Sequence, residues 1–224
     1  MIEKKVNFDD FNQNHAVWCG ADSESADLAR DVDVLCQANM DYISVAPAAV
    51  KTVWPWLENK NVKIMARFYM TDSEMNEDLV SDVTKRINTV LKNGAHGAQV
   101  FLPYNCLADL VAQTHIIRDD LFFNKDLSIG VDICEIDSSE WKNLFELLHQ
   151  INASSLMLFM SKDLGNKSDF TGRIYGLLDV WSDENNFDLH FYFGPNFMRI
   201  EQTGRLIQSL RPGLMKGTRF FVGL

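Results

Sequence analysis

Several side chains that can do chemistry alternate with apolar residues in the strand-like runs of this chain. Three stand out: the carboxylate of Asp132, the imidazole of His190 and the guanidinium of Arg67. A carboxylate or an imidazole can give or take a proton, and an arginine can hold an anion through two parallel hydrogen bonds. If these runs lie in one sheet, the three side chains can form a single acid/base and anion-binding site.

Eight short runs rich in β-branched and aromatic residues must position these side chains, and amphipathic stretches of helical length separate the runs. Eight β/α units are the number found in a closed (β/α)8 barrel, a fold that typically takes ~250 residues. The 224 residues therefore predict an α/β fold, a TIM barrel built as a single domain over residues 1–224. The predicted strands are His15–Gly20, Asp41–Pro47, Val62–Tyr69, Ala98–Pro103, Leu127–Cys134, Ser155–Ser161, Phe187–Gly194 and Arg219–Gly223.

Seven amphipathic segments are predicted to form the helices between these strands. Lys92-Asn93-Gly94 is typical of a helix end, because glycine readily takes the left-handed conformation that stops a helix. Pro55 interrupts the second segment, so that helix should be short or kinked. The predicted helices are Ser23–Met40, Ala48–Asn59, Asn76–Asn93, Asn105–Phe123, Ser138–Asn152, Ser168–Asn185 and Met198–Leu210.

Alternation along each strand predicts which side chains point into the barrel. One face of a barrel strand packs against the helices and the other fills the lumen. In the fifth strand, Ile129, Val131 and Ile133 form the apolar file, which leaves Asp132 facing inward. The same reading of the other strands gives the remaining inward side chains. The lumen is predicted to hold Arg67, Tyr69, Gln99, Asp132, Met157, His190 and Tyr192.

Charges inside the barrel need partners, because an unpaired buried charge costs about 3–5 kcal/mol. We therefore expect Asp132 to pair with Arg67, with His190, or with both. Such a pair could be a structural contact that plugs the barrel. It could equally be functional, with Asp132 or His190 as a general acid/base and Arg67 as an anion clamp. Residue spacing leaves both interpretations open.

Composition narrows the classes of partner. A net charge of -10 argues against a nucleic acid or an anionic membrane surface, although a few backbone amides could still hold a phosphorylated small molecule. Four widely spaced cysteines indicate reduced thiols rather than a zinc site, and no run reaches 18 apolar residues. We therefore expect a cytoplasmic protein without a membrane span, and predict neither a metal nor a cofactor.

Several segments resemble deoxyribose-phosphate aldolase. Ser44–Val50, SVAPAAV, followed by Asn61–Ile64, NVKI, resembles that family's second and third strands, where a V-x-P-x-x-V turn precedes a V-K strand. Ile129–Glu140 is similar to the fifth strand, an acid-x-Cys segment that leads into a helix opening with acidic residues. Gly94-Ala95 and Gly217-Thr218-Arg219 are similar to the starts of strands four and eight. The resemblance spans most of the chain and implies an aldolase-type barrel.

The catalytic positions that the resemblance implies carry other residues. The family uses a Schiff-base lysine on strand six, a second lysine on strand seven and an aspartate on strand four. Aligning the strands places Met157, Tyr192 and Gln99 at these positions. A thioether cannot form an imine, and a phenol supplies no fixed positive charge. Lys162, just beyond strand six, is the one displaced lysine that could still serve.

The family's phosphate site is altered as well. Its glycine-glycine turn after strand seven reads Gly194-Pro195-Asn196 here, and Pro195 removes a backbone donor. Asn196 remains as a substrate-binding candidate in that turn. The family continues beyond strand eight into a glycine-rich turn and a helix, whereas this sequence reaches Leu224 directly after the strand. We expect the last helix to be missing or reduced.

Two functions fit these observations. The first is a lyase that acts on a small carbonyl or sugar-phosphate compound without the usual lysine. Asp132, His190, Tyr192 and Lys162 would be its catalytic candidates, and Arg67, Tyr69, Gln99 and Asn196 would bind substrate. The alternative is a catalytically inactive barrel that acts as a binding or assembly protein. Its lumen would be closed by Phe101, Met157, Phe159 and Phe193, and an uncovered barrel flank would favour a homo-oligomer.

Overall fold

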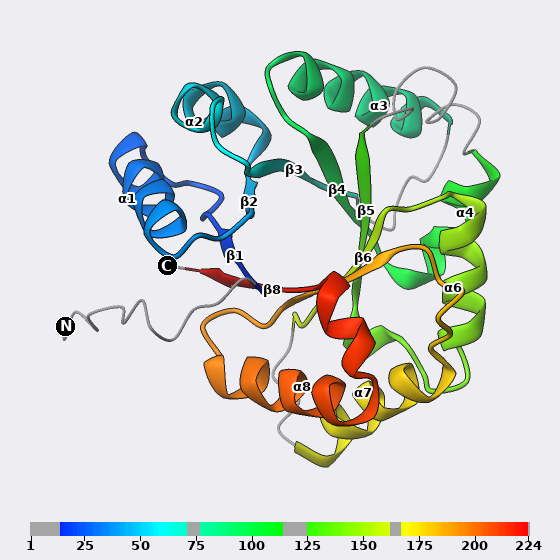
Figure 1. Cartoon of the computed structure of the whole chain (residues 1–224). Coiled ribbons are helices and arrows are strands. Elements are labelled where there is room, and N and C mark those ends of the chain that lie inside the picture. Colours follow the sequence, from blue (N-terminus) through cyan, green and yellow to red (C-terminus); the bar gives the residue numbers. More distant parts are fainter. Residues whose placement is uncertain (1–13, 71–76, 114–124, 162–166, 224) are drawn as a thin grey trace.

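The computed structural model describes residues 14–70, 77–113, 125–161 and 167–223. In these ranges eight parallel strands close into one barrel, each pairing with the next along the chain and β8 with β1. Figure 1 shows the helices arranged around the strands. The predicted (β/α)8 barrel is confirmed. The strands are β1 (His15–Trp18), β2 (Tyr42–Val45), β3 (Lys63–Tyr69), β4 (Gly97–Phe101), β5 (Asp126–Asp132), β6 (Ser155–Phe159), β7 (Asp188–Tyr192) and β8 (Thr218–Gly223).

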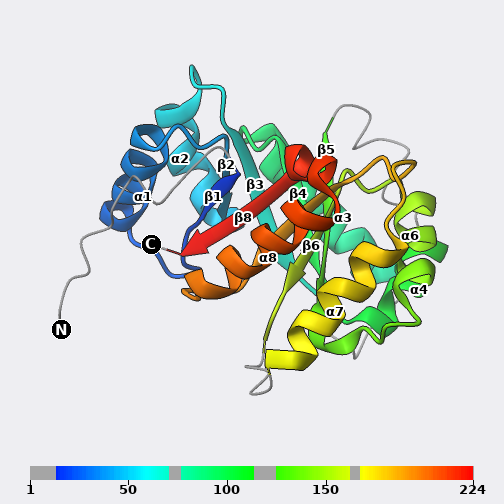
Figure 2. The same ribbon diagram turned by 60° about the horizontal axis from the view of Figure 1, so that its bottom comes forward.

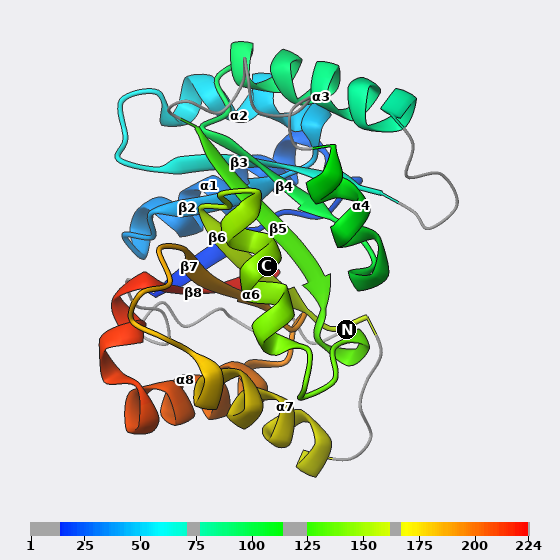
Figure 3. The same ribbon diagram turned by 90° about the vertical axis from the view of Figure 1, so that its right-hand side faces the viewer.

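The helices of the described residues lie on the outside of the barrel and turn an apolar stripe toward it. In Figure 3, α2 and α3 lie on one side of the barrel and α7 and α8 on the opposite side. The buried residues of α3 show the helical spacing, since Val80, Val83, Ile87 and Val90 recur every three or four positions. The helices are α1 (Ser25–Gln37), α2 (Val50–Leu57), α3 (Glu77–Lys92), α4 (Leu107–Ala112), α6 (Trp141–Gln150), α7 (Lys167–Val180) and α8 (Phe197–Leu210).

Two predicted features of the helices, the short second helix and the end of the third, have a clear local cause. Helix α2 is short, eight residues, and contains Pro55 in its second half. Gly94 ends the segment after α3 with a φ of 106°, and a Cβ there would lie 2.4 Å from the Trp54 ring. Only glycine fits that conformation and that contact. Both predictions are therefore confirmed by the structure.

The strands separate two apolar cores. Ile129, Val131 and Ile133 belong to the core between strands and helices, as the alternation predicts. A second cluster fills the lumen, and Met157 and Phe101 are both part of it. Phe193 lies in the outer core, with its ring 5.1 Å from that of Phe170, so the prediction that Phe193 helps to close the lumen is wrong. The lumen cluster comprises Ala16, Trp18, Tyr42, Met65, Phe101, Met157 and Phe221, with Phe159 and Tyr192 packed against it.

One flank of the barrel carries no helix in the described part of the chain. Strand β8 is the last element of these residues, and Figure 2 shows it in the foreground between α1 and α8. Among the described residues, no helix combines the length and apolar character needed to cross a membrane.

Candidate functional site

The position of a lumen side chain along its own strand gives its approximate height in the barrel. Near the carboxyl end, Tyr69 of β3 pairs with Phe101 of β4, and Phe159 of β6 pairs with Tyr192 of β7. Two residues nearer the amino end, Arg67 pairs with Gln99 and Met157 with His190. The carboxyl end is where barrel enzymes hold their catalytic groups. The upper level is therefore the candidate site.

Five aromatic rings, linked by pairwise contacts, form this end of the lumen, which we call the aromatic mouth (Trp18, Tyr69, Phe101, Phe159 and Tyr192). Trp18 stacks on Tyr192 with ring centroids 3.9 Å apart and planes 11° apart. Phe101 meets Trp18 at 5.6 Å and Phe159 at 5.4 Å, both edge to face, and stacks on Tyr69 at 5.1 Å. Each such contact adds to the stability gained from burial.

Gly130 explains why the ring of Phe101 can lie so deep in the mouth. A Cβ on Gly130 would lie 2.3 Å from the Phe101 ring. Glycine on β5 therefore leaves the space that the phenylalanine of β4 fills. Phe101 is only 2% exposed, whereas Tyr69 at the outer edge of the mouth is 62% exposed.

Met157 lies beneath the mouth and is fully buried. This is the position of the Schiff-base lysine in the resemblance to deoxyribose-phosphate aldolase, and a thioether cannot condense with a carbonyl. Among the described strands, Lys63 is the lysine that lines the lumen. It begins β3 at the amino end, where its Nζ lies 2.6 Å from a carboxylate oxygen of Asp126. No amine of the described strands faces the mouth.

Arg67 is the buried cation of the site, and its partners are neutral. Nη1 donates to the carbonyl and hydroxyl oxygens of Ser44 at 2.8 and 3.2 Å, and Nη2 donates to the carbonyl of Cys19 at 2.5 Å. Its guanidinium lies 4.2 Å from the centroid of the Trp18 ring. Burial lowers the pKa of Arg67. Within the described residues no carboxylate binds it, so the predicted ion pair with Asp132 is wrong.

Asp132 is satisfied by neighbours on the rim of the barrel. One carboxylate oxygen accepts a hydrogen bond from the backbone N–H of Cys134 at 2.9 Å. The other accepts from the backbone N–H of Ser161 at 3.3 Å and from its hydroxyl. Asp132 ends β5 and Ser161 follows β6, so this carboxylate ties two strand ends together. Local donors thus replace the cation that we expected.

His190 is isolated from the mouth. It is 2% exposed, and its ring contacts Tyr42 and Phe221, each with centroids 5.5 Å away. Neither ring nitrogen has a hydrogen-bond partner among the described residues, and burial lowers the pKa of His190 to about 3. The imidazole is therefore neutral at pH 7, and the predicted pairing with Asp132 is wrong. His190 instead lines a chamber of about 30 Å³ at the amino end of the barrel, with Lys63, Asp126 and Asp188.

Gln99 belongs to a buried hydrogen-bond network that was not predicted from the sequence. The amide oxygen of Gln99 accepts a hydrogen bond from the Ser44 hydroxyl, which in turn accepts one from Arg67. Ser44 and Trp18 were not among the predicted site residues. The alternation in β1 and β2, read as in the other strands, would have placed both inside the barrel. A buried hydrogen-bond network of Arg67, Ser44 and Gln99 thus lies below Trp18, and the partners of the arginine in it are uncharged.

The remaining candidates divide between the mouth and the helix side. Tyr192 is half-buried in the mouth, and burial raises the pKa of its phenol. The side chain of Asn196 accepts a hydrogen bond from the backbone N–H of Arg199 at 3.2 Å and so caps α8. Lys162 lies outside the described residues. The structure therefore brings Arg67, Tyr69 and Tyr192 together. Asp132 lies beside Phe159 at the edge of the mouth, and His190 and Asn196 lie apart from it.

Comparisons with known proteins support the fold alone. No family model matches the chain, and no curated protein matches it in sequence. Among solved structures it is similar to a putative deoxyribose-phosphate aldolase from Coccidioides immitis, with a TM-score of 0.65 and 10% identity over 96% of this chain and 83% of that one. The tetrameric deoxyribose phosphate aldolase from Aeropyrum pernix gives a TM-score of 0.65 and 11% identity over 97% and 88%.

A further solved structure shares this architecture. The HMG-CoA lyase from Bacillus subtilis matches with a TM-score of 0.61 and 16% identity over 96% of this chain and 73% of that one. Identities this low carry no information on the reaction. The chain has the aldolase-type (β/α)8 barrel, as the sequence resemblance implied.

Proposed function

We propose that this chain is an aldolase-type barrel that acts by binding and not by imine catalysis. The observation that carries the proposal is the burial of Met157 under the packed rings of the mouth. The resemblance to deoxyribose-phosphate aldolase aligns this residue with the Schiff-base lysine. The other hypothesis, a lyase for a small carbonyl or sugar-phosphate compound, requires a general acid/base beside the substrate. The Asp132 carboxylate already accepts hydrogen bonds from Cys134 and Ser161, and His190 lies below the mouth, which favours binding over that reaction.

The mouth supports a small planar anion as the ligand. Tyr69 offers an exposed aromatic face, and the hydroxyls of Tyr69 and Tyr192 can donate hydrogen bonds. Beneath them, Arg67 carries a positive charge that carbonyl and hydroxyl oxygens solvate but do not neutralise. A buried cation of this kind favours an anion nearby. Arg67, Tyr69 and Tyr192 are therefore the proposed binding residues.

Reductive trapping tests the absence of imine chemistry. The protein is incubated with acetaldehyde, glyceraldehyde 3-phosphate or pyruvate, treated with borohydride and weighed as the intact chain, beside a lysine-dependent aldolase as a positive control. We expect no adduct. An adduct that disappears in Lys162→Arg would make Lys162 the Schiff-base residue and would overturn the proposal.

A titration tests the ligand. Benzoate serves as the planar anion, with acetate and inorganic phosphate as non-aromatic anions, and binding is followed by calorimetry. We expect saturable binding of benzoate that Tyr69→Ala weakens about tenfold, the loss of roughly one stacking contact. Tyr175→Ala, which removes a comparably exposed tyrosine of α7, should leave the affinity unchanged. Equal affinities in both variants would remove the mouth as the binding site.

Two further features of the protein belong to this proposal. Phe197 and Met198, at the start of α8, are exposed apolar side chains and support a homo-oligomer, because exposed apolar surface favours association. The four cysteines are thiols in the structure, which supports a reducing, cytoplasmic location.

A further inference from the structure

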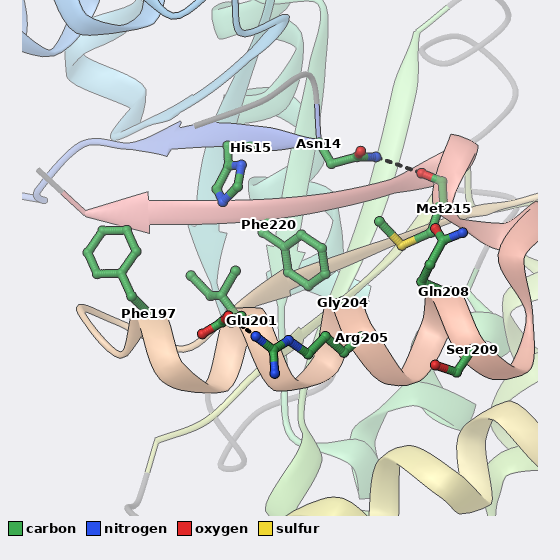
Figure 4. A pocket seen from close by; sticks show the side chains of 11 residues that line it. Asn14, His15, Phe197, Glu201, Gly204, Arg205, Gln208, Ser209, Met215 and Phe220 are labelled. Carbon is green, nitrogen blue, oxygen red and sulfur yellow. Dashed lines mark hydrogen bonds and ion pairs between the residues drawn. The ribbon is translucent and has the colours of Figure 1, made fainter. Parts of the chain in front are cut away.

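Two cavities of the described residues differ in whether their walls leave buried polar groups unpaired. A groove of about 770 Å³ runs between α8 and the strands β8 and β1 (Figure 4). The charges on its edge satisfy each other, since the Arg205 Nη2 lies 2.5 Å from a Glu201 carboxylate oxygen. The chamber of about 30 Å³ at the amino end of the barrel is lined by His190, whose two ring nitrogens have no hydrogen-bond partner in the described part of the chain. In the chamber, therefore, a bound molecule would satisfy a buried group.

The imidazole of His190 needs both a hydrogen-bond donor and an acceptor. In its neutral form one ring nitrogen carries an N–H and the other carries a lone pair. Aromatic neighbours cannot supply these partners, and the ring lies against those of Tyr42 and Phe221, with centroids 5.5 Å away in both cases. Bulk solvent does not reach the residue, which is 2% exposed. Buried polar groups in native proteins are paired with protein atoms or with ordered water, so the chamber is where the partners must come from.

The wall of the chamber restricts what can bind there. Asp126 and Asp188 line it and repel an anion, and the Lys63 ammonium beside Asp126 repels a cation. Within the described ranges, no three histidine, cysteine or carboxylate side chains are grouped so that they could hold a metal ion. A volume of about 30 Å³ is far too small for an organic ligand, whereas about 10–15 Å³ is enough for one water. The chamber therefore fits a small neutral molecule, and water is the one that both donates and accepts.

We propose that this chamber binds ordered water, which bridges the His190 imidazole to polar side chains at the amino end of the barrel. A water molecule can donate to one ring nitrogen or accept from the other, and it needs about two to four polar partners to stay in place. Ser155 of β6 and Asp188 of β7 line the same chamber and offer a hydroxyl and a carboxylate. Water can enter from solvent, because the side chains of Lys63 and Asp126 on the chamber wall are 47% and 28% exposed. The site lies away from the mouth, so its test is independent of ligand binding there.

A high-resolution crystal structure tests where the water lies. We expect a water peak at about 2.7–3.2 Å from a ring nitrogen of His190, with a second contact to Ser155 or Asp188. A ring nitrogen that binds a protein group directly would contradict the proposal, because the imidazole would then need no water. A peak with about six or more oxygen ligands at about 2.3–2.6 Å would contradict it as well, since that is the coordination of a calcium ion.

Water contacts measured by NMR test the site in solution. The methyl group of Met65, a residue that lines the chamber and is 1% exposed, should show a nuclear Overhauser cross-peak to water. His190→Phe removes both ring nitrogens and should abolish that cross-peak, although the hydroxyls of Tyr42 and Ser155 remain. His149→Phe, the matched control at an exposed position of α6, should leave the cross-peak unchanged.

Ser155→Val is a second variant, and it leaves the imidazole in place. It replaces the hydroxyl on the chamber wall with methyl groups that take up the space of the water, so the cross-peak at Met65 should be lost here too. A cross-peak that keeps its full size in both variants would come from exchanging hydroxyl protons and would overturn the proposal. The same conclusion would follow if the Met65 methyl group of the wild type showed no contact with water, since the chamber would then be dry.

Discussion

The two ends of this barrel are filled by different kinds of side chain. At the carboxyl end, the rings of the aromatic mouth pack on one another and cover Met157. At the amino end, charges are paired: Lys63 with Asp126 at 2.6 Å and Arg219 with Asp41 at 2.7 Å. Barrel enzymes hold catalytic groups at the carboxyl end, whereas the amino end contributes stability. In this chain the charged pairs lie at the end that stabilises the fold. Aromatic rings fill most of the carboxyl end, with the Asp132 carboxylate on its rim and Arg67 beneath Trp18.

His190 lies between these two regions and shows how they are kept apart. The residue lines a small polar chamber on the amino side, and its ring packs on Phe221 in the apolar lumen. An imidazole in this position is held neutral by burial and cannot exchange a proton with a substrate at the mouth. The difference between the ends teaches that an inward-facing histidine or carboxylate is not catalytic by virtue of direction alone.

The largest effect is expected from removing the central ring of the mouth. Phe101→Ala deletes a 2% exposed ring that contacts three others, and should lower the free energy of unfolding in urea by about 3–5 kcal/mol. Tyr69→Ala, at the exposed edge, should cost about 1 kcal/mol or less. Equal losses from the two variants would mean that the mouth is not a packed core.

The next largest effect is expected on acidification, as a loss of folding stability caused by His190. Its folded-state pKa of about 3 lies below the ordinary 6.5, so the unfolded chain takes up the proton first as the pH falls. Stability from this group is complete above pH 6.5 and declines toward pH 3, by about 3 kcal/mol between pH 7 and pH 4. Burial raises the pKa of Asp188, which acts in the opposite direction in that window.

The variant His190→Phe isolates the histidine contribution. Urea unfolding of both proteins at a series of pH values gives the difference, and the variant should lose less stability in acid. At pH 7 it should be near the wild type in stability, because it removes two unpartnered buried nitrogens. Parallel pH profiles for the two proteins would show that His190 is not buried as described.

A smaller loss is expected from the cation beneath the mouth. Arg67→Met leaves the carbonyls of Cys19 and Ser44 without their donors and should cost about 1–3 kcal/mol of unfolding free energy. Arg67→Lys keeps the positive charge and should recover only part of the lost unfolding free energy, since an ammonium cannot span both carbonyls in the same geometry. A neutral or stabilising Arg67→Met would indicate that the arginine serves ligand binding and contributes nothing to the fold.

The smallest effect belongs to the ion pair at the amino end. Asp41→Asn weakens the contact with Arg219, but the aspartate is 37% exposed, so the loss should stay below about 1 kcal/mol. The loss should shrink further in about 1 M salt, which screens partly exposed charges. Asp27→Asn on α1, whose pair with Arg30 is more exposed, should cost less still. If Asp41→Asn lowered the unfolding free energy by several kcal/mol, the ion pair of Asp41 with Arg219 would have to be buried.

Much of the fold could be predicted because its signals are local. Pleating alternates side chains across a strand, so the apolar file Ile129, Val131 and Ile133 was enough to direct Asp132 inward. Strand and helix ranges followed from periodicity, and Gly94 marked its helix end through backbone freedom. The resemblance to deoxyribose-phosphate aldolase agrees with the solved structures in fold.

The partners inside the barrel could not be predicted in the same way. The expected pairs of Asp132 were wrong because alternation gives the side of the strand on which a residue lies, and not its height in the lumen. Height depends on the stagger between strands around the closed barrel, which raises Asp132 to the rim beside Ser161 and leaves His190 low beside Tyr42.

The sequence by itself determined the order of the elements and the inward file of the strands that alternation was applied to, including the thioether of Met157. Tertiary structure alone decided that Arg67 binds the carbonyls of Cys19 and Ser44, and that five rings close the mouth. The physical reason is that these contacts join strands far apart in the chain, and only closure of the barrel brings their side chains within reach.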